Sequence, residues 1–205
     1  MRVQVHVEPL CRLLSCLDMR DSRIILVTGL PGTGKTTLAR ALAARYRLPL
    51  IAKDLIKEPL LDVVGASDAA QSRRLSDASF AVLFAIAREL HAAGADMLLE
   101  GNFRPGEHEQ VLRESLTVWT SANPIARFAQ VLCRVDESER LSRLARRRAD
   151  PLRHAGHRDG DLALQAPASR GEAFLDLPGA EFVHDGADDR NVLTALDAWW
   201  YSRAI

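Results

Sequence analysis

The sequence predicts an α/β fold in which a five-stranded parallel sheet lies between two layers of helices, as a three-layer sandwich. Two observations predict it. Short apolar runs alternate with helical periodicity along the chain, and the first apolar run leads through a glycine-rich loop directly into a helix. A chain of 205 residues suffices for one domain of this kind. We therefore expect residues 23–205 to form the domain, with residues 1–22 as an N-terminal extension.

The first predicted strand, loop and helix follow one another without interruption. Residues 24–27 are continuously apolar, which is typical of a strand that is buried on both faces. Residues 35–46 carry apolar side chains at helical spacing, and Pro49 lies just beyond the predicted helix end. The glycines between these two segments therefore form a turn from a buried strand into a helix.

The next elements continue the alternation of strand and helix. Residues 50–52 form a short second strand, followed by a helix that Pro59 is expected to interrupt or restart. Ser76 or Asp77 is the expected cap of a long helix that runs through His91.

Three further strands complete the predicted sheet. They lie at residues 97–99, 128–135 and 181–184, and a closing helix is predicted at residues 191–203. Five strands with intervening helices give the parallel sheet with helices on both faces.

The glycine-rich segment is a complete phosphate-binding loop, made of Gly29, Leu30, Pro31, Gly32, Thr33, Gly34, Lys35 and Thr36. Its glycines allow backbone N–H groups to surround phosphate oxygens at a helix N-terminus. Lys35 is expected to reach the β- and γ-phosphates and Thr36 to ligate Mg²⁺, while Thr37 can add a contact to the α-phosphate. We therefore expect a P-loop NTPase fold with ATP and Mg²⁺ as cofactors.

Downstream residues narrow the class of P-loop protein. The chain has 24 arginines and three lysines, and no lysine follows Lys57, which excludes the usual Asn-Lys-x-Asp guanine-binding element. A Leu-Ser-Gly-Gly-Gln-like signature of ABC-type ATPases is absent, and there is little room for the helical lid domain of an AAA+ motor. Small phosphotransferases remain.

An arginine-rich segment is the predicted lid, at about residues 137–168. Residues 137–149 form an arginine-dense helix, and residues 150–168 are rich in Gly, Pro, His and Asp, as in a loop. Arg143 and Arg147 are four residues apart on one helix face. The same helix also carries Arg140, Arg146 and Arg148.

The motifs resemble those of the zeta-toxin, chloramphenicol-phosphotransferase and polynucleotide-kinase branch of P-loop kinases. The resemblance rests on the phosphate-binding loop, on Lys53-Asp54 after the second strand and on residues 100–105, Glu-Gly-Asn-Phe-Arg-Pro. Residues 153–157, Arg-His-Ala-Gly-His, look like the Arg-His-Pro-Gly-His stretch of bacterial AAA family kinases. The resemblance implies that Asp54 orients or deprotonates the acceptor hydroxyl, and that Arg143 and Arg147 close over ATP and neutralise the charge of the transferring phosphoryl group.

Other polar residues follow the second and third strands, where open parallel sheets build their sites. Lys57, one turn beyond Asp54, is a candidate for holding substrate or phosphate, and Glu100 for contacting substrate or binding Mg²⁺ through water. Asn102 and Arg104 are further substrate candidates. Structural alternatives stay open: Asp54 as a helix cap, Lys57 as a surface lysine, and Asn102 and Arg104 as the start of the next helix.

Composition limits the other possibilities. No apolar run approaches the ~20 residues of a membrane helix, so we expect a cytoplasmic protein without membrane partners. The net charge of zero argues against strong nonspecific binding of nucleic acid, although a local basic groove remains possible. Cys11, Cys16 and Cys133 form no CxxC pair, and His154 and His157 have no matching ligand pair for zinc.

The sequence thus supports three hypotheses about function. The first is an ATP-dependent phosphotransferase that acts on a hydroxyl of a small molecule, such as a metabolite, nucleoside or antibiotic. The second is a polynucleotide 5′-hydroxyl kinase, and the third is a nucleotide-binding regulatory or toxin-like protein. No motif in the sequence selects the acceptor.

Overall fold

The computed structural model describes residues 22–122, 127–150, 154, 173–186 and 189–202. Most of the expected N-terminal extension, residues 1–21, lies outside this part of the chain. The same holds for most of the loop half of the expected lid, of which only Asp150 and His154 are described.

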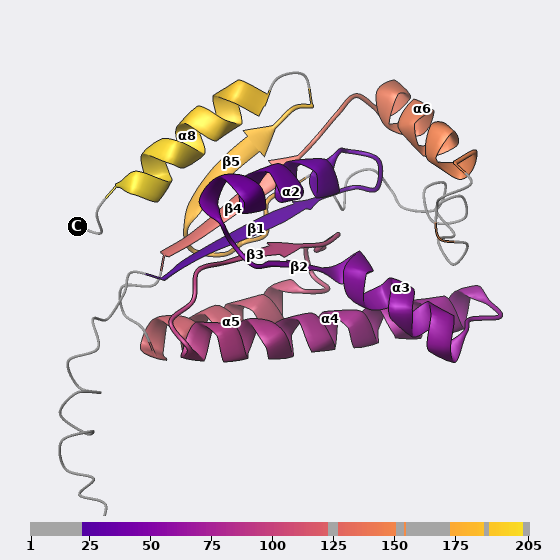
Figure 1. The fold of residues 1–205 in the computed structure, drawn as a ribbon, viewed down its shortest axis with the longest axis horizontal. Helices are drawn as coiled ribbons and strands as arrows, with labels where there is room; N and C mark the ends of the chain where they lie inside the picture. Colours follow the sequence, from indigo (N-terminus) through magenta and orange to yellow (C-terminus); the bar gives the residue numbers. More distant parts are fainter. Residues whose placement is uncertain (1–21, 123–126, 151–153, 155–172, 187–188, 203–205) are drawn as a thin grey trace, which may run out of the picture.

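A five-stranded parallel sheet forms the centre of the molecule, with the strand order β2-β3-β1-β4-β5 (Figure 1). All four strand pairs are parallel, as the sequence predicts. The strands are β1 (Arg23–Gly29), β2 (Leu50–Ala52), β3 (Met97–Glu100), β4 (Arg127–Cys133) and β5 (Ala180–His184). The order places β1 in the middle, so the loop that follows it lies near the centre of the sheet's carboxyl edge.

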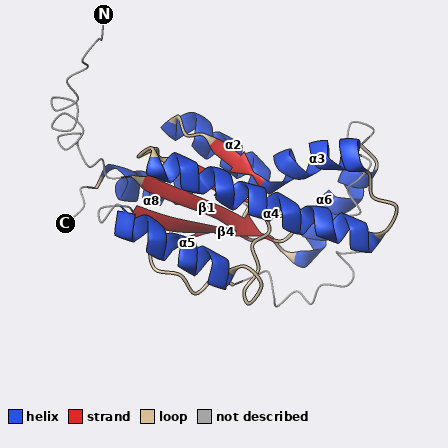
Figure 2. Cartoon of the chain, turned by 90° about the horizontal axis from the view of Figure 1, so that it is seen from below, coloured by secondary structure: helices blue, strands red, loops and turns tan. Residues whose placement is uncertain are grey.

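Helices cover both faces of the sheet. One face carries α2 (Lys35–Tyr46) and α8 (Asp189–Tyr201), and the other carries α4 (Ala69–Ala92) and α5 (Glu109–Ala122). Figure 2 shows α4 and α5 on the same side of the sheet, near β1 and β4. The three-layer α/β sandwich predicted from the sequence is confirmed.

Alternating residues of β1 divide the core between the two faces. Ile24 and Leu26 pack with Leu83 of α4, whereas Ile25 and Val27 pack with α2 and α8. All four strand residues are at most 1% exposed. A strand buried on both faces explains why the segment is apolar without alternation.

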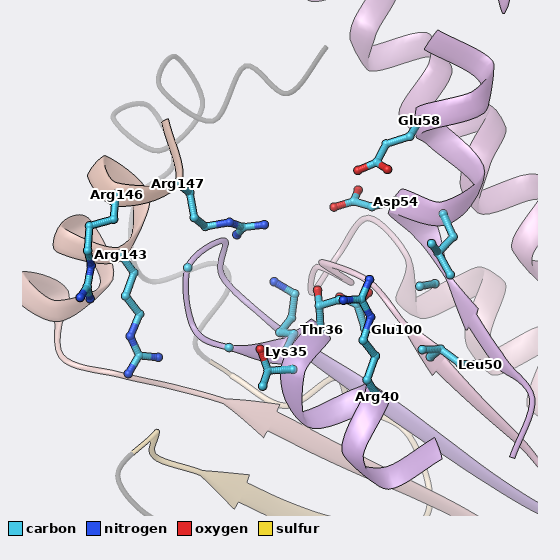
Figure 3. Close-up of a pocket in the computed structure, with 15 residues that line it drawn as sticks. Lys35, Thr36, Arg40, Leu50, Asp54, Glu58, Glu100, Arg143, Arg146 and Arg147 are labelled. Atoms are coloured by element: carbon cyan, nitrogen blue, oxygen red, sulfur yellow. The ribbon is translucent and has the colours of Figure 1, made fainter. Parts of the chain in front are cut away.

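Two helices lie beyond the carboxyl ends of the strands, α3 (Lys53–Val64) and α6 (Glu137–Arg148) (Figure 1). Helix α3 follows β2 directly, α6 follows β4 after three residues, and the two helices stand on either side of the phosphate-binding loop (Figure 3). Pro59 was expected to interrupt or restart the helix, but α3 is continuous through it. The proline is exposed and costs α3 a single internal N–H donor, in its second turn.

The long helix α4 begins earlier than predicted. Its cap is Asp68, whose carboxylate accepts a hydrogen bond of 2.8 Å from the Gln71 N–H, so the caps expected at Ser76 and Asp77 are wrong. The first turns of α4 carry mostly polar residues, which hid the helical periodicity in the sequence. Ser72 is nevertheless 7% exposed, because α3 packs on this part of α4.

No helix within the described residues is long and apolar enough to cross a membrane.

Candidate active site

A cleft of about 580 Å³ opens at the carboxyl ends of the strands (Figure 3). Its walls come from the phosphate-binding loop and α2, from α3 with the ends of β2 and β3, and from α6. This is the edge at which open parallel sheets place their ligand sites.

The phosphate-binding loop turns sharply between β1 and α2. Gly34, directly before α2, has φ of +92°, and Gly29 has φ of +137° with no room for a Cβ, which would lie 2.3 Å from the carbonyl oxygen of Cys133. Inside the loop, the Thr33 hydroxyl donates to the Leu30 carbonyl at 2.8 Å. The backbone N–H groups at the start of α2 therefore face a preformed turn that is suited to an anion.

Lys35 lies at the bottom of the cleft and is 9% exposed. Its Nζ donates to the Leu30 carbonyl at 2.9 Å. Burial lowers the pKa of Lys35, and the nearby Glu100 carboxylate opposes this effect. Thr36 and Thr37 also line the cleft, so the three loop residues that the sequence assigns to phosphate and metal reach the same space.

Glu100 ends β3 and lines the cleft while only 4% exposed. Burial raises the pKa of Glu100; the ammonium of Lys35 opposes the rise, and Asp54 adds to it. Glu100 has neither a hydrogen bond nor an ion pair within the described residues. Such a buried carboxylate is suited to a cationic or hydrogen-bonding ligand.

The oxygen donors of the cleft fit a magnesium ion. The hydroxyl of Thr36 and the carboxylate of Glu100 line the same space, and Mg²⁺ usually takes one or two protein oxygens together with water and phosphate oxygens. The described residues contain no group of three or more His, Cys, Asp or Glu side chains that could hold a metal by itself.

Asp54 lies in the first turn of α3 and points into the cleft (Figure 3). The helix starts at Lys53, and Ala52 takes the cap position, so the alternative that Asp54 serves as an N-cap is wrong. Lys53 is largely buried, and its Nζ lies 3.1 Å from the Asp54 carboxylate. The Asp54 side chain is 44% exposed and thus accessible to a ligand.

Three substrate candidates from the sequence do not line the cleft. Lys57 is 6% exposed and donates to the Ser72 hydroxyl at 3.0 Å, so it packs against α4 and is no surface lysine. Arg104 pairs with Glu107 at 3.3 Å, and Asn102 is also absent from the cleft wall. Neither Asn102 nor Arg104 begins the next helix, since α5 starts at Glu109. A spacing of three residues from Asp54 did not carry Lys57 to the cleft, because that helix face packs on α4.

Arginines of α6 form the wall opposite α3. Arg143, Arg146 and Arg147 line the cleft, while Arg148 does not. Arg143 lies 2.7 Å from Glu139, whereas Arg147 makes no ion pair with any residue that the structure describes. Arg143 and Arg147 thus share a face, as their spacing predicts, and that face is directed at the phosphate-binding loop (Figure 3).

Arg140 has a different place from the other arginines of α6. It is 4% exposed, holds Glu137 through two bonds of 2.7 Å, and approaches the Pro31 carbonyl at 3.4 Å. Its backbone also packs against Gly32, where an added Cβ would lie 3.0 Å from the Arg140 carbonyl oxygen. Arg140 therefore supports the phosphate-binding loop through its contacts with Pro31 and Gly32.

Sequence reasoning missed Glu58 and Arg40, which both line the cleft. Each lies four residues after a predicted site residue on the same helix, Glu58 after Asp54 and Arg40 after Thr36. The i+4 rule would have found both. His154 approaches Asp62 of α3 at 2.8 Å, and His157 is outside the described residues.

Comparison with known proteins agrees with this architecture. A proposed kinase of Chloroflexus aurantiacus j-10-fl is 29% identical, with a TM-score of 0.73, and the match covers 88% of this chain and 97% of that one. A sugar kinase of Janibacter sp. HTCC2649 is 15% identical with a TM-score of 0.52, covering 87% and 94%. The APS kinase of Mycobacterium tuberculosis, in complex with AMPPNP and APS, is 16% identical with a TM-score of 0.50, covering 87% and 98%. The last two likenesses show the fold alone.

No curated protein matches the chain significantly. The family described as AAA domain matches residues 24–162, which are more than half of the chain and include the phosphate-binding loop, α3, β3 and α6. The chain therefore belongs to this AAA domain family and has a P-loop kinase-like fold.

Proposed function

We propose that the protein transfers the γ-phosphoryl group of ATP to a hydroxyl of a small molecule. The observation that carries this proposal is one cleft that brings together a phosphate-binding loop, the accessible carboxylate of Asp54 and the arginine face of α6. A protein that only binds nucleotide needs the loop. The carboxylate and the arginines are what a transfer reaction adds.

The residues divide the chemical step between them. The acceptor oxygen forms a bond to the γ-phosphorus while the bond from that phosphorus to the bridging oxygen of ADP breaks. Asp54 orients the acceptor hydroxyl and takes its proton. Lys35, Arg143 and Arg147 balance the negative charge on the transferring group and on the departing ADP.

Thr36 and Glu100 are the residues that would hold Mg²⁺, Glu100 through water. A bound Mg²⁺ supplies additional positive charge at the phosphate oxygens. Burial keeps the Glu100 carboxylate poorly solvated, which strengthens its attraction to any cation that enters the cleft.

Radiolabelled ATP tests the proposal. Purified protein is incubated with Mg²⁺, γ-³²P-ATP and a panel of metabolites, nucleosides, antibiotics and a 5′-hydroxyl oligonucleotide. Lys35→Ala should lose ATP binding, whereas Asp54→Asn should keep it and lose transfer by about 10²-fold or more. Asp77→Asn, an exposed position on α4, is the matched control and should behave as wild type.

The outcomes separate the alternative hypotheses. Transfer to the oligonucleotide alone would replace the proposal by a polynucleotide kinase, the second hypothesis from the sequence. The turned-away positions of Lys57 and Arg104 remove two cations that such an acceptor would use. Tight binding of ATP that stays intact with every acceptor would favour a regulatory or toxin-like nucleotide-binding protein instead.

Membership of the zeta-toxin, chloramphenicol-phosphotransferase and polynucleotide-kinase branch is part of the same proposal. It is supported by the position of Asp54 directly after β2 and of Glu100 at the end of β3.

A further inference from the structure

The charges of the cleft are unevenly distributed (Figure 3). The half formed by the phosphate-binding loop and α6 presents the cations Lys35, Arg143, Arg146 and Arg147, and one further cation, Arg40 of α2, lies on the side of Leu50 and Glu100. The other half, formed by the start of α3 and the end of β3, presents the carboxylates of Asp54, Glu58 and Glu100. A triphosphate matches the first half, which leaves the second to the acceptor.

Two of the three acids of helix α3 line the cleft, whereas its two lysines do not. Asp54 and Glu58 are four residues apart and share a face, and the exposed Leu55 lies beside them in the cleft wall. Lys57 contacts Ser72 on α4. Lys53 does not line the cleft, but its ammonium lies 3.1 Å from the Asp54 carboxylate and offsets that charge, so a cationic group of the acceptor is assigned to Glu58 rather than to Asp54. This helix therefore offers an entering molecule carboxylates and an apolar contact.

Glu100 also indicates a cationic or hydrogen-bonding ligand on this side of the cleft, and Mg²⁺ is one such ligand in the proposed function. It is 4% exposed, lines the cleft and has no hydrogen-bond or ion-pair partner in the described part of the chain. A buried carboxylate without a partner is costly unless a ligand supplies a donor or a positive charge. Mg²⁺ at the phosphates can satisfy Glu100, but Asp54 and Glu58 belong to α3, on the acceptor side.

We infer that the acceptor is a hydroxyl compound that carries a protonated amine, such as an amino alcohol or an amino sugar, with Glu58 as the residue that binds the amine. The inference rests on the proposed function and names its substrate class. Opposite charges attract strongly in a partly desolvated cleft, whereas a phosphate or carboxylate would be repelled by this wall and by the bound triphosphate.

Arg40 allows a test of the alternative, in which the site prefers an anionic acceptor. It lies one turn along α2 from Thr36, lines the cleft near Leu50 and is exposed. An anionic acceptor would depend on Arg40, and an aminated acceptor on Glu58. The two single variants therefore separate the two classes of acceptor.

The experiment uses acceptors that share a skeleton and differ in charge. One set is D-glucosamine, D-glucose and D-glucuronate, and a second is ethanolamine, ethylene glycol and glycolate. Kanamycin and a 5′-hydroxyl oligonucleotide extend the cationic and anionic ends. Phosphorylated product is measured with Mg²⁺ and γ-³²P-ATP, and kcat/KM is determined for each acceptor that reacts.

The amine of a reacting set should exceed its carboxylate partner in kcat/KM by about 10- to 100-fold. Glu58→Gln should reduce this preference to within about threefold while leaving the ATP Kd unchanged, and Glu58→Lys should reverse it. Glu89→Gln, an exposed glutamate of α4 that does not line the cleft, is the matched control and should keep the preference. Arg40→Gln should keep it as well.

Each other result overturns the inference in a recognisable way. Preferred transfer to a carboxylate, lost in Arg40→Gln, would show an anionic small-molecule acceptor and leave the proposed function intact. Transfer to the oligonucleotide alone would replace that function by a polynucleotide kinase. Equal use of amine and neutral partners would remove the role of Glu58. No product from any acceptor, cationic, neutral or anionic, would overturn the proposed function and this inference with it.

Discussion

The two halves of the cleft acquire their charged groups in different ways. The phosphate-binding half uses residues that are adjacent in the sequence, and much of its binding capacity comes from backbone N–H groups that need only a tight turn. The acceptor half depends on which face α3 turns toward α6, and that face is set by packing against α4. A contiguous motif therefore defines the donor site, whereas tertiary contacts define the acceptor site.

The largest effect should come from the arginines that face the donor half. Arg147→Ala is expected to lower kcat by about 10²- to 10³-fold, because it removes positive charge from the developing transition state. Measured by initial rates, Arg143→Ala should show a similar loss, while the ATP Kd changes by less. Arg148→Ala is the matched control, because it lies on the same helix but outside the cleft wall. Equal losses in Arg147→Ala and Arg148→Ala would indicate a general effect on α6.

A smaller effect is expected for Arg140, which contacts the phosphate-binding loop. Arg140→Met should weaken ATP binding by about tenfold and lower stability by about 1–3 kcal/mol, because a buried guanidinium that holds Glu137 and approaches the Pro31 carbonyl is lost. Calorimetric titration with ATP and chemical unfolding measure the two quantities. Arg140→Lys, which keeps the charge without the fork geometry, should recover part of the ATP affinity. Unchanged ATP affinity in Arg140→Met would refute this supporting role.

The fold was largely predictable because its signals are local. The apolar run of β1, the glycine loop and the periodicity of α2 each depend on neighbouring residues, and the structure agrees at all three. The start of α4 was missed because its first turns are mostly polar. These turns contact α3, and a contact of this kind does not appear in the sequence as apolar periodicity. Helix α5 was not assigned from the sequence, although Leu112 and Leu116 share its buried face.

The candidate site was predictable only in part. Lys35, Thr36, Asp54 and Glu100 reach one cleft because strand ends converge at one edge of a parallel sheet. Lys57 does not reach the cleft. Its spacing of three residues from Asp54 did not determine whether its side chain would face the cleft or pack on α4. The roles of all these residues stay predictions until they are measured.

A single substitution tests whether Lys57 packs against α4 without a role in the cleft. Lys57→Met should leave ATP binding and transfer within about twofold of wild type and lower the free energy of unfolding by about 1 kcal/mol, because a buried hydrogen bond to Ser72 is lost. Denaturant unfolding and initial rates check the two parts. Ser72→Ala should give a similar loss of stability. A strong loss of transfer in Lys57→Met would return this lysine to the site.

The smallest effect concerns stability and pH at Glu100. Because burial raises the pKa of Glu100, the folded protein holds this proton more tightly than the unfolded chain. The resulting stability is present below the ordinary glutamate value of 4.5 and is lost as the pH rises through the higher value of the folded state. Glu100→Gln carries no charge, so its melting temperature relative to wild type should increase as the pH rises above 4.5, by about 2–4 °C for each 1 kcal/mol. Thermal unfolding at several pH values measures the difference, with Glu89→Gln on the surface as the control. A difference that shrinks as the pH rises would mean that Lys35 outweighs burial at Glu100, and that the carboxylate stabilises the fold in addition to serving the cleft.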